Sequence, residues 1–537
     1  MFATLLSLVP FLALSALALD DNAMRQRSVY QLVTDRFALP NNGTTACSTS
    51  QAKYCGGTWQ AIIGHLDYIQ GMGFDTVWIS PVVDNIGGTT SIGEAYHGYW
   101  TLDPANLNSH FGSADDLKAL ASALHSRGMY LQVDVVINHV AATSGQSFQP
   151  SSSYGAFSTT DDYHPFCWVQ DYTNQTEVEQ CWLGDNNVAL ADLNTENSNV
   201  VSYWNDWIKN LISEYSIDTI RIDTVKHVPH SFWSQFIDNV NVFNQGEVLD
   251  ADPAYIASYQ KNGSINPFNY AVYYPVTFTF NSTSFSMDQL IGMVDQIKGN
   301  FTDPTLLGSF LNNHDNPRFE SFQSDSALIR NAHAYPMVTD GIPYVYYGSE
   351  QGFTGGSDPL NREALWTSKY NTGSDMYRFF ASLNAARAAA GAASSSFYTT
   401  QMSLTGMTSN ELLIAKGPLV SLLSNRGASA SSPDITIPVA STNWAPNTAI
   451  IDAISCNTFT TNSGGDLVLK VENGLPRILI ADSIKGKVCD PSLVATSNST
   501  GSGGSSGGNN AAGQRAGASL TAVAGVVAMA VLGAALL

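Results

Sequence analysis

Short, nearly continuous apolar runs recur along the first part of the chain, and longer segments with apolar residues every three or four positions separate them. Continuous runs predict strands buried on both faces, whereas the longer spacing predicts amphipathic helices. The predicted strands are residues 28–36, 75–81, 130–139, 219–224, 244–248, 306–312 and 342–348. The predicted helices include residues 57–71, 115–127, 201–215 and 287–297.

Alternation of strand and helix over this length predicts a parallel sheet, and we expect an α/β fold built as a (β/α)8 TIM barrel. A doubly wound open sheet is the structural alternative. It is less favoured because no Gly-rich phosphate loop opens the first strand–helix unit.

Two stretches interrupt the alternation and divide the chain into domains. Residues 140–199 are polar and rich in Ser, Asp and Tyr, which indicates a B subdomain inserted after the third strand. Residues 395–492 combine Ser, Thr and Gly with short alternating runs, which predicts a C-terminal antiparallel β-sandwich domain. The barrel would then comprise residues 19–139 and 200–394.

Both ends of the chain carry targeting patterns. Residues 1–18 match a signal peptide, because the stretch is apolar and ends in Ala-Leu-Ala, although its start lacks a basic residue. Residues 493–512 form a Ser/Gly-rich stalk, and residues 513–537 end in an apolar tail that matches a GPI-anchor propeptide. We therefore expect the secretory pathway and a GPI anchor that holds the protein at the extracellular face of the plasma membrane or in the cell wall. A tail-anchoring helix is the alternative.

Cysteines and glycosylation sequons agree with an oxidising, extracellular environment. The cysteines fall along the sequence in neighbouring pairs, and we expect local disulfides. The pairs are Cys47 with Cys55, Cys167 with Cys181, and Cys456 with Cys489. Asparagines also stand in Asn-x-Ser/Thr sequons, of which we expect some to be glycosylated. The sequon residues are Asn42, Asn174, Asn262, Asn281, Asn300 and Asn498.

The amino-acid composition limits the kinds of molecule that we expect the protein to bind. Of the 537 residues, 44% are hydrophobic, which is typical of a globular protein with a large core. The formal net charge of −21 opposes binding to phosphate backbones, so we expect no nucleic-acid partner. Aromatic residues make up 11% of the chain, and their flat faces suit sugar rings, although most are expected to fill the core. We expect a monomer.

Polar residues that could act in catalysis or binding stand at the carboxyl ends of the predicted strands. They are Asn138 and His139 at the third strand, Asp223 at the fourth, Glu247 at the fifth, and His314 and Asp315 at the seventh. Active sites of parallel barrels lie on that face. Because unrelated structural polar residues would not prefer one end of the strands, this shared position favours a functional role.

Arg221 and Asp223 share one face of the fourth strand, because side chains alternate along a strand. An arginine beside a carboxylate keeps it ionised and fixes its orientation, as a nucleophile requires. Carboxylates on three strands suit glycoside chemistry, which needs a nucleophile and an acid/base. Glu247 has apolar or neutral neighbours, so burial would raise its pKa and keep it protonated as the acid. The structural alternatives are an ordinary ion pair for Asp223, a helix cap for Glu247 and a turn for Asp315.

Four segments resemble the signature segments of the α-amylase family, glycoside hydrolase family thirteen, and most closely those of secreted fungal α-amylases. They read D-V-V-I-N-H at 134–139, R-I-D-T-V-K-H at 221–227, G-E-V at 246–248 and N-H-D at 313–315. The resemblance extends over about residues 26–490. It implies that Asp223 is the nucleophile, Glu247 the acid/base and Asp315 the stabiliser of the transition state.

The same resemblance implies contacts to the substrate. Arg221 would orient Asp223, while Lys226 and His227 would touch the leaving-group side. The positions that match contacts to the sugar at the cleavage site are His97, Tyr99, Trp100, His139, His314, Asp358 and Arg362. For each histidine taken alone, a structural role would be the commoner one.

Members of this family also hold a structural calcium between the barrel and the inserted subdomain, so the resemblance implies Ca²⁺ as a cofactor. Calcium requires oxygen ligands. The matching positions are the side chains of Asn138 and Asp192 and the main-chain carbonyls of Glu179 and His227.

Some positions depart from the fungal pattern. Ala191 stands where fungal members have Pro, and Asn312 stands where they have Glu. Fungal amylases often carry a further disulfide in the region of residues 259–303, where this chain has no Cys. Ala191 and Asn312 lie beside site residues, so these two departures concern the details of the sugar subsites, while the catalytic carboxylates remain.

The sequence therefore predicts a retaining, endo-acting α-amylase of the fungal cell surface that hydrolyses α-1,4-glucosidic bonds of starch- or glycogen-like α-glucans or maltooligosaccharides. If the acceptor is a sugar hydroxyl instead of water, the enzyme is a 4-α-glucanotransferase acting on cell-wall α-glucan, as some fungal wall relatives are. A wall protein that binds carbohydrate without turnover is a further alternative. The intact carboxylates Asp223, Glu247 and Asp315 speak against it.

Overall fold

A computed structural model describes residues 19–431 and 433–490, and a parallel barrel forms its centre. The strands follow the spatial order β10-β11-β1-β2-β3-β7-β8-β9. They are β1 (Val29–Gln31), β2 (Thr76–Ile79), β3 (Tyr130–Val135), β7 (Thr219–Ile222), β8 (Phe243–Gly246), β9 (Asn266–Pro267), β10 (Gly308–Ser309) and β11 (Ile342–Tyr346). A parallel bridge between Phe268 and Gly308 joins the two ends of this order. The predicted (β/α)8 barrel is confirmed.

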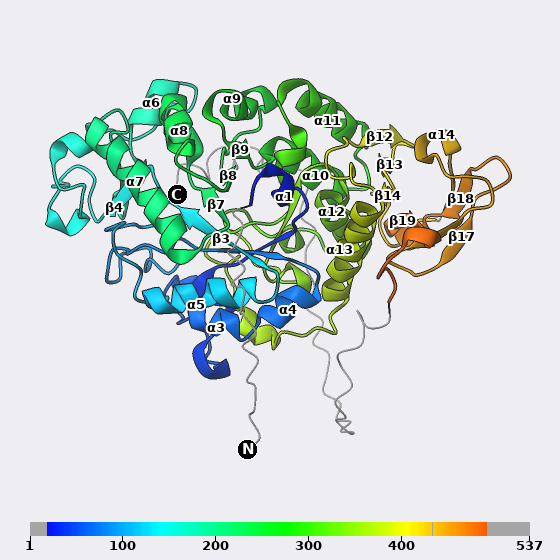
Figure 1. The fold of residues 1–537 in the computed structure, drawn as a ribbon, viewed down its shortest axis with the longest axis horizontal. Coiled ribbons are helices and arrows are strands. Elements are labelled where there is room, and N and C mark those ends of the chain that lie inside the picture. The colour runs from blue at the N-terminus through cyan, green and yellow to red at the C-terminus, as the bar shows by residue number, and fades with distance from the viewer. Residues whose placement is uncertain (1–18, 432, 491–537) are drawn as a thin grey trace, which may run out of the picture.

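Helices surround the strands (Figure 1). They are α3 (Trp59–Ile63), α4 (Leu66–Gly71), α5 (Ala114–His125), α7 (Ser198–Tyr215), α8 (His230–Ile237), α9 (Pro253–Gly263), α10 (Tyr270–Asn281), α11 (Asp288–Asn300), α12 (Ser326–Val338) and α13 (Asp375–Ala393). The sequence explains α5, in which Ser113 and Asp116 form a capping box at the start and Leu117, Leu120 and Leu124 face the core.

Several predicted elements differ in the structure. The strand predicted at 28–36 ends at Gln31, and Thr34–Phe37 form the short helix α2. The helix predicted at 57–71 is divided into α3 and α4 at Gly64, a residue of low helix propensity. Strand β9 was not predicted, because an Asn-Pro pair carries no apolar run and becomes a strand only beside β8.

The chain between β3 and β7 forms a small antiparallel sheet in the order β4-β6-β5. Its elements are β4 (His139–Ala142), β5 (Leu183–Gly184), β6 (Ala189–Asp192) and the helix α6 (Gln175–Gln180). In Figure 1 this inserted subdomain lies at one end of the long axis of the molecule, opposite the C-terminal strands. It begins directly at the carboxyl end of β3, so it stands beside the open face of the barrel.

The C-terminal domain is antiparallel, as predicted. One sheet has the order β12-β13-β14-β19-β16-β17, and the second pairs β15 with β18. The elements are β12 (Ser403–Gly406), β13 (Glu411–Lys416), β14 (Leu419–Ser424), β15 (Asp434–Ile437), β16 (Ala449–Asp452), β17 (Thr458–Thr460), β18 (Leu467–Lys470), β19 (Arg477–Ala481) and the helix α14 (Val439–Thr442). Alternating side chains of β15 and β18 enter a separate apolar core, among them Ile435, Ile437, Leu467 and Leu469.

The predicted disulfides are confirmed: Cys47–Cys55, Cys167–Cys181 and Cys456–Cys489 are bonded. The described chain starts just before the short helix α1 (Asp21–Met24). The expected signal peptide, the stalk at 493–512, the anchor propeptide at 513–537 and the sequon at Asn498 lie outside the described residues. Within the described part of the chain, no helix has the length and apolar character required to span a membrane.

A buried ion pair fixes the C-terminal domain to the barrel. Lys416, at the end of β13, donates to Asp340 Oδ1 over 2.6 Å and to the carbonyl of Thr400 over 2.6 Å. Asp340 precedes β11 and also accepts the backbone N–H of Met402 over 3.0 Å. Both side chains are almost completely buried, so neither charge is solvated by water.

The substitution Lys416→Met should therefore lower the free energy of unfolding by about 3–5 kcal/mol, because it leaves a buried carboxylate without a counter-charge. Urea denaturation measures this change. The matched double variant Lys416→Met/Asp340→Asn removes both charges and should recover most of the loss. A single variant as stable as the wild type would contradict the interpretation.

Candidate active site

A cavity of about 330 Å³ opens at the carboxyl ends of the barrel strands, and the inserted subdomain contributes part of its wall. Most of the candidate residues border this cavity. They are His97, Tyr99, Trp100, His139, Asp223, Lys226, His227, Glu247, His314, Asp315, Asp358 and Arg362. The structure thus brings together side chains that follow different barrel strands.

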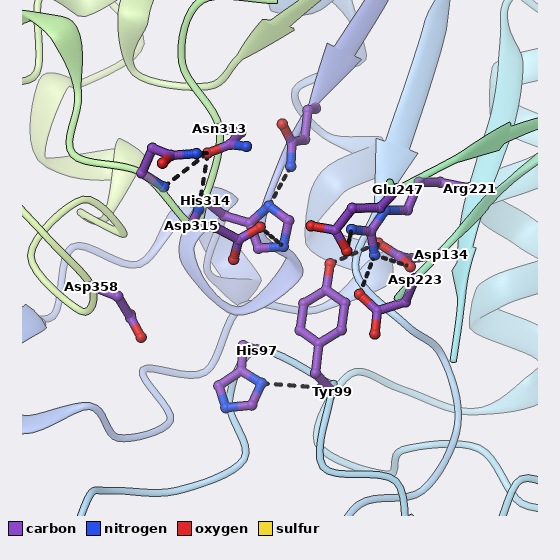
Figure 2. Close-up of polar contacts among 12 residues, drawn as sticks. His97, Tyr99, Asp134, Arg221, Asp223, Glu247, Asn313, His314, Asp315 and Asp358 are labelled. Atoms are coloured by element: carbon purple, nitrogen blue, oxygen red, sulfur yellow. Dashed lines mark hydrogen bonds and ion pairs between the residues drawn. The ribbon is translucent and has the colours of Figure 1, made fainter. Parts of the chain in front are cut away.

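Arg221 connects the carboxylates from a fully buried position. The register of β3 and β7 pairs Asp134 with Arg221 on neighbouring strands. The guanidinium donates through Nη1 to Asp134 Oδ1 over 2.9 Å and to Asp223 Oδ1 over 2.7 Å. Its Nη2 lies 2.8 Å from Glu247 Oε2. One cation therefore orients both carboxylates of the expected nucleophile and acid/base pair (Figure 2).

The backbone before Glu247 needs a glycine. A Cβ at Gly246 would lie 2.2 Å from Ile265 Cγ2, so a larger residue would displace this strand end. The carboxylate of Glu247 also accepts the backbone N–H of Thr224 over 3.2 Å, across the neighbouring strand end. The close packing at Gly246 and the contacts with Thr224 and Arg221 thus fix the orientation of the Glu247 side chain.

Burial decides the protonation of the carboxyl groups. It raises the pKa of Glu247, while Arg221 opposes this shift and the negative charge of Asp223 adds to it. Burial, with the charge of Glu247, raises the pKa of Asp315 to about 8. Burial raises that of Asp134 to about 7, against the attraction of Arg221. Burial thus favours the protonated form of Glu247, the direction that an acid requires.

Asp315 is positioned by contacts from two loops. Its backbone N–H donates to Asn313 Oδ1 over 3.1 Å within its own loop. From the loop after β11, Arg362 lies 3.4 Å from Asp315 Oδ1 and donates to the carbonyl of His314 over 3.0 Å. Asp358 balances this arginine at 3.1 Å. In Figure 2 the carboxyl group of Asp315 faces the side on which Glu247 and Asp223 lie.

The histidines around the cavity are neutral. Burial lowers the pKa of His139 to about 4, and it lowers the pKa of His97 and His314 well below the usual range. His97 Nδ1 accepts the backbone N–H of Tyr99 over 3.1 Å, which leaves the proton on Nε2. Gln31 approaches His314 Nδ1 at 2.7 Å from β1. Neutral imidazoles can donate to or accept from sugar hydroxyls.

Tyr99 borders the cavity and also contacts His314 and Asp134. Its ring lies parallel to the ring of His314 at 5.2 Å, and its hydroxyl donates to Asp134 Oδ2 over 2.6 Å. Asp134 also accepts the indole N–H of Trp78 over 3.0 Å. The tyrosine therefore connects the loop after β2 with the carboxylate that faces Arg221.

The expected leaving-group side lies next to the inserted subdomain. Lys226 donates to the carbonyl of Leu249 over 2.7 Å, and its ammonium lies 4.8 Å from the ring centre of Tyr172. His227 Nδ1 lies 2.9 Å from the carbonyl of Val178, in α6. These contacts hold α6 against the loop after β7.

The residues expected to bind calcium come from adjacent segments. The backbone N–H of Leu193 donates to the carbonyl of Asn138, which places Asp192 beside Asn138. Asn138 Oδ1 and Asp192 Oδ1 are both buried, and neither has a hydrogen-bond partner. The described residues contain no cluster of three or more His, Cys, Asp or Glu side chains suited to a metal. The two unpartnered oxygens nevertheless fit a hard cation that takes carbonyl and amide ligands as well.

His164 supplies part of the charge balance at this place. It lies 2.6 Å from Asp192 Oδ2 and 2.8 Å from Glu196 Oε2. Burial alone would lower its pKa, but the bonds to the two carboxylates raise it to about 9. One carboxylate oxygen of Asp192 is therefore paired with the imidazole of His164, and the other has no hydrogen-bond partner.

Asn312 belongs to a buried network behind the Asp315 loop. Its amide donates to Glu320 Oε2 over 2.9 Å, and its oxygen accepts the backbone N–H of Phe319 over 2.9 Å. Glu320 also bonds His333 of α12 at 2.6 Å. The network uses Asn312 to hold both ends of the loop that carries Asp315.

Sequence reasoning did not select every residue that shapes the site. Asp134 stands in a segment that matched the family, but its contact with Arg221 depends on strand register. Gln31 and Tyr172 lie in segments without a chemical signal. Only Asp134 had a detectable cue, since a charged residue inside a continuous apolar strand requires a partner.

A parallel barrel whose carboxyl end gathers these carboxylates around one arginine has the architecture of a glycoside hydrolase. Residues 31–401 match the family profile described as Alpha amylase, catalytic domain, and residues 403–497 match Alpha-amylase, domain C. The chain belongs to the α-amylase family.

Individual relatives agree with this assignment. An α-amylase of Saccharomycopsis fibuligera is 43% identical over 466 residues, which cover 87% of this chain and 93% of the relative. Alpha-amylase 1 of Lipomyces kononenkoae is 52% identical over 364 residues, which cover 68% of this chain and 58% of that longer relative. The solved structure of an α-amylase from Malbranchea cinnamomea is 41% identical with a TM-score of 0.84, covering 87% of this chain and 99% of that one.

The raised pKa of Glu247 predicts the alkaline side of the pH profile. The acid must be protonated, so kcat/KM on a maltooligosaccharide should fall as the pH rises through this pKa. The falling limb should therefore lie above 4.5, the ordinary value for glutamate. Initial rates across a pH series measure it. A limb at or below the ordinary value would exclude Glu247 as the group that burial keeps protonated.

Proposed function

We propose that this protein is a retaining, endo-acting α-amylase that hydrolyses α-1,4-glucosidic bonds of starch- or glycogen-like α-glucans. The observation that supports it best is the binding of Asp223 and Glu247 to one guanidinium, that of Arg221, at 2.7 and 2.8 Å. An inverting enzyme keeps its two carboxyl groups roughly 6.5–9.5 Å apart to admit a water molecule. Two carboxylates on adjacent nitrogens of one arginine favour the closer, retaining arrangement.

The proposed reaction has two displacements. Asp223, oriented by Arg221, attacks the anomeric carbon while Glu247 donates its proton to the leaving glycosidic oxygen. The leaving sugar departs past Lys226 and His227. Glu247, now a carboxylate, accepts a proton from the incoming water, whose oxygen displaces Asp223 from the anomeric carbon.

Other side chains act on the sugar ring at the cleavage site. Asp315 and the neutral imidazoles of His139 and His314 border the same cavity and offer hydrogen-bonding atoms to ring hydroxyls. Bonds that strengthen as the ring flattens lower the barrier more than bonds equal in both states. Arg362 holds Asp315 in place from the next loop.

Calcium fits this proposal as a structural ion. Asn138 and Asp192 would supply side-chain oxygens, and Glu179 and His227 would supply main-chain carbonyls. When bound, the ion would neutralise buried oxygen charge and join the barrel to the inserted subdomain. The ion would affect the reaction only indirectly, by fixing the positions of His139 and of the loop that contains Lys226.

A 4-α-glucanotransferase is the second candidate. The acceptor side of the cavity carries the ring of Tyr172 and the side chain of Leu249, surfaces that a sugar covers better than a water molecule does. The carboxylates would act identically, with a sugar hydroxyl in place of water. The expected signal peptide and GPI anchor would place either activity at the cell surface.

Product analysis with maltoheptaose distinguishes these candidates. Products that are only shorter indicate hydrolysis, longer products indicate transfer, and unchanged maltoheptaose indicates a binding protein.

Asp223→Asn and Glu247→Gln should each lower kcat by roughly 10²–10⁴-fold, because each removes a group that acts in bond cleavage. Asp206→Asn, an exposed change of the same kind on α7, is the matched control. If either active-site variant kept most of the wild-type rate, its assigned role would be wrong.

Removal of calcium should lower the thermal stability. At a calcium concentration 100-fold above Kd, a bound ion stabilises the folded state by roughly 2.7 kcal/mol. Chelation should therefore lower the melting temperature, and added Ca²⁺ should restore it. Asp192→Asn should weaken this response, whereas Asp206→Asn should not. An unchanged melting temperature after chelation would argue against a calcium site.

A further inference from the structure

The sequon Asn174-Gln175-Thr176 lies next to a segment that borders the catalytic cavity. Tyr172, two positions before it, lines the cavity and contacts the ammonium of Lys226. Asn174 is the residue that precedes α6, and its side chain is exposed. The sequon therefore stands on the side of the cavity where the leaving-group half of a substrate would lie.

Contacts with the barrel fix the position of this sequon. Gln175 donates to the carbonyl of Lys226 over 3.3 Å and accepts the hydroxyl of Tyr255 over 2.8 Å. His227 bonds Val178 of the same helix. Because α6 is tied to the residues after β7, a group attached to Asn174 cannot move away with its helix.

The side chain of Asn174 is available for modification. It makes no capping hydrogen bond to α6, although it occupies the capping position. By contrast, the amide of Asn300 donates to the carbonyl of Gln296, and the residue is half-buried. Asn42 and Asn262 are exposed, but no residue adjacent to either of them lines the cavity.

We infer that Asn174 carries an N-linked glycan that restricts the entry of long α-glucans from the Lys226 side, while short maltooligosaccharides still enter. In the transfer, a bond forms between Asn174 Nδ2 and C1 of an N-acetylglucosamine, and the bond from C1 to a lipid diphosphate breaks. The amide proton is lost, and the lipid diphosphate is the leaving group. The inference rests on the proposed function and on passage through the secretory pathway.

The restriction is steric and depends on substrate length. A glycan is bulky and strongly hydrated, and it cannot be compressed against the protein without losing that hydration. A polymer that continues beyond the leaving-group side must share space with it, whereas a short oligosaccharide ends before the rim. The glycan would therefore select among substrates without touching the reacting atoms.

The experiment uses the full chain secreted from a yeast host. Asn174→Gln and Thr176→Ala each abolish the sequon by a different change, and both side chains are exposed. Asn262→Gln, at an exposed sequon away from the cavity, is the matched control. Glycopeptide mass spectrometry determines occupancy, and kcat/KM is measured on soluble starch and on a chromogenic maltooligosaccharide.

Both sequon variants should raise kcat/KM on starch severalfold and leave the oligosaccharide rate nearly unchanged, while Asn262→Gln should change neither. An unmodified Asn174 peptide in the secreted wild type would overturn the inference. So would an unchanged ratio of starch to oligosaccharide activity after removal of an occupied sequon. A protein inactive on both substrates, with Asn174 glycosylated, would instead overturn the proposed function and with it the selection by length.

Discussion

The buried guanidinium of Arg221 is the charge on which the arrangement of the site depends. It faces Asp134, Asp223 and Glu247, and within the described part of the chain none of these carboxylates forms an ion pair with another Arg or Lys. In an environment of low polarity, a carboxylate without such a partner would take up a proton or turn toward solvent. Because one cation serves several acids, burial still raises the pKa of Glu247 and of Asp134 against the attraction of Arg221.

This arrangement is possible because strand register and loops supply different parts of it. The pairing of β3 with β7 places Asp134 beside Arg221. Asp223 and Glu247 are the residues that directly follow the paired strands β7 and β8. Asp315 comes instead from a long loop, which needs Asn313, Arg362 and the network behind Asn312 to hold it. The strand-borne groups are rigid through the sheet, whereas the loop-borne group is rigid through side-chain hydrogen bonds.

The inserted subdomain couples several properties of the enzyme. It begins at His139, contributes to the cavity wall, and brings α6 against the loop that carries Lys226 and His227. The unpartnered oxygens of Asn138 and Asp192 lie at its base. A change in its attachment would therefore displace the cavity wall, His139 and the oxygens of Asn138 and Asp192 together.

Local pattern alone predicted the barrel over a doubly wound sheet, the inserted subdomain, the antiparallel C-terminal domain, the disulfide pairs and the gathering of polar residues at strand ends. Continuous apolar runs, alternation and spacing are properties of neighbouring residues, and they can be read without a structure. Strand β9, the contact of Asp134 with Arg221, and the network of Asn312, Glu320 and His333 were decided only by the tertiary structure. Each joins residues distant in sequence, and its free energy comes from burial and register, which exist only once the chain has folded.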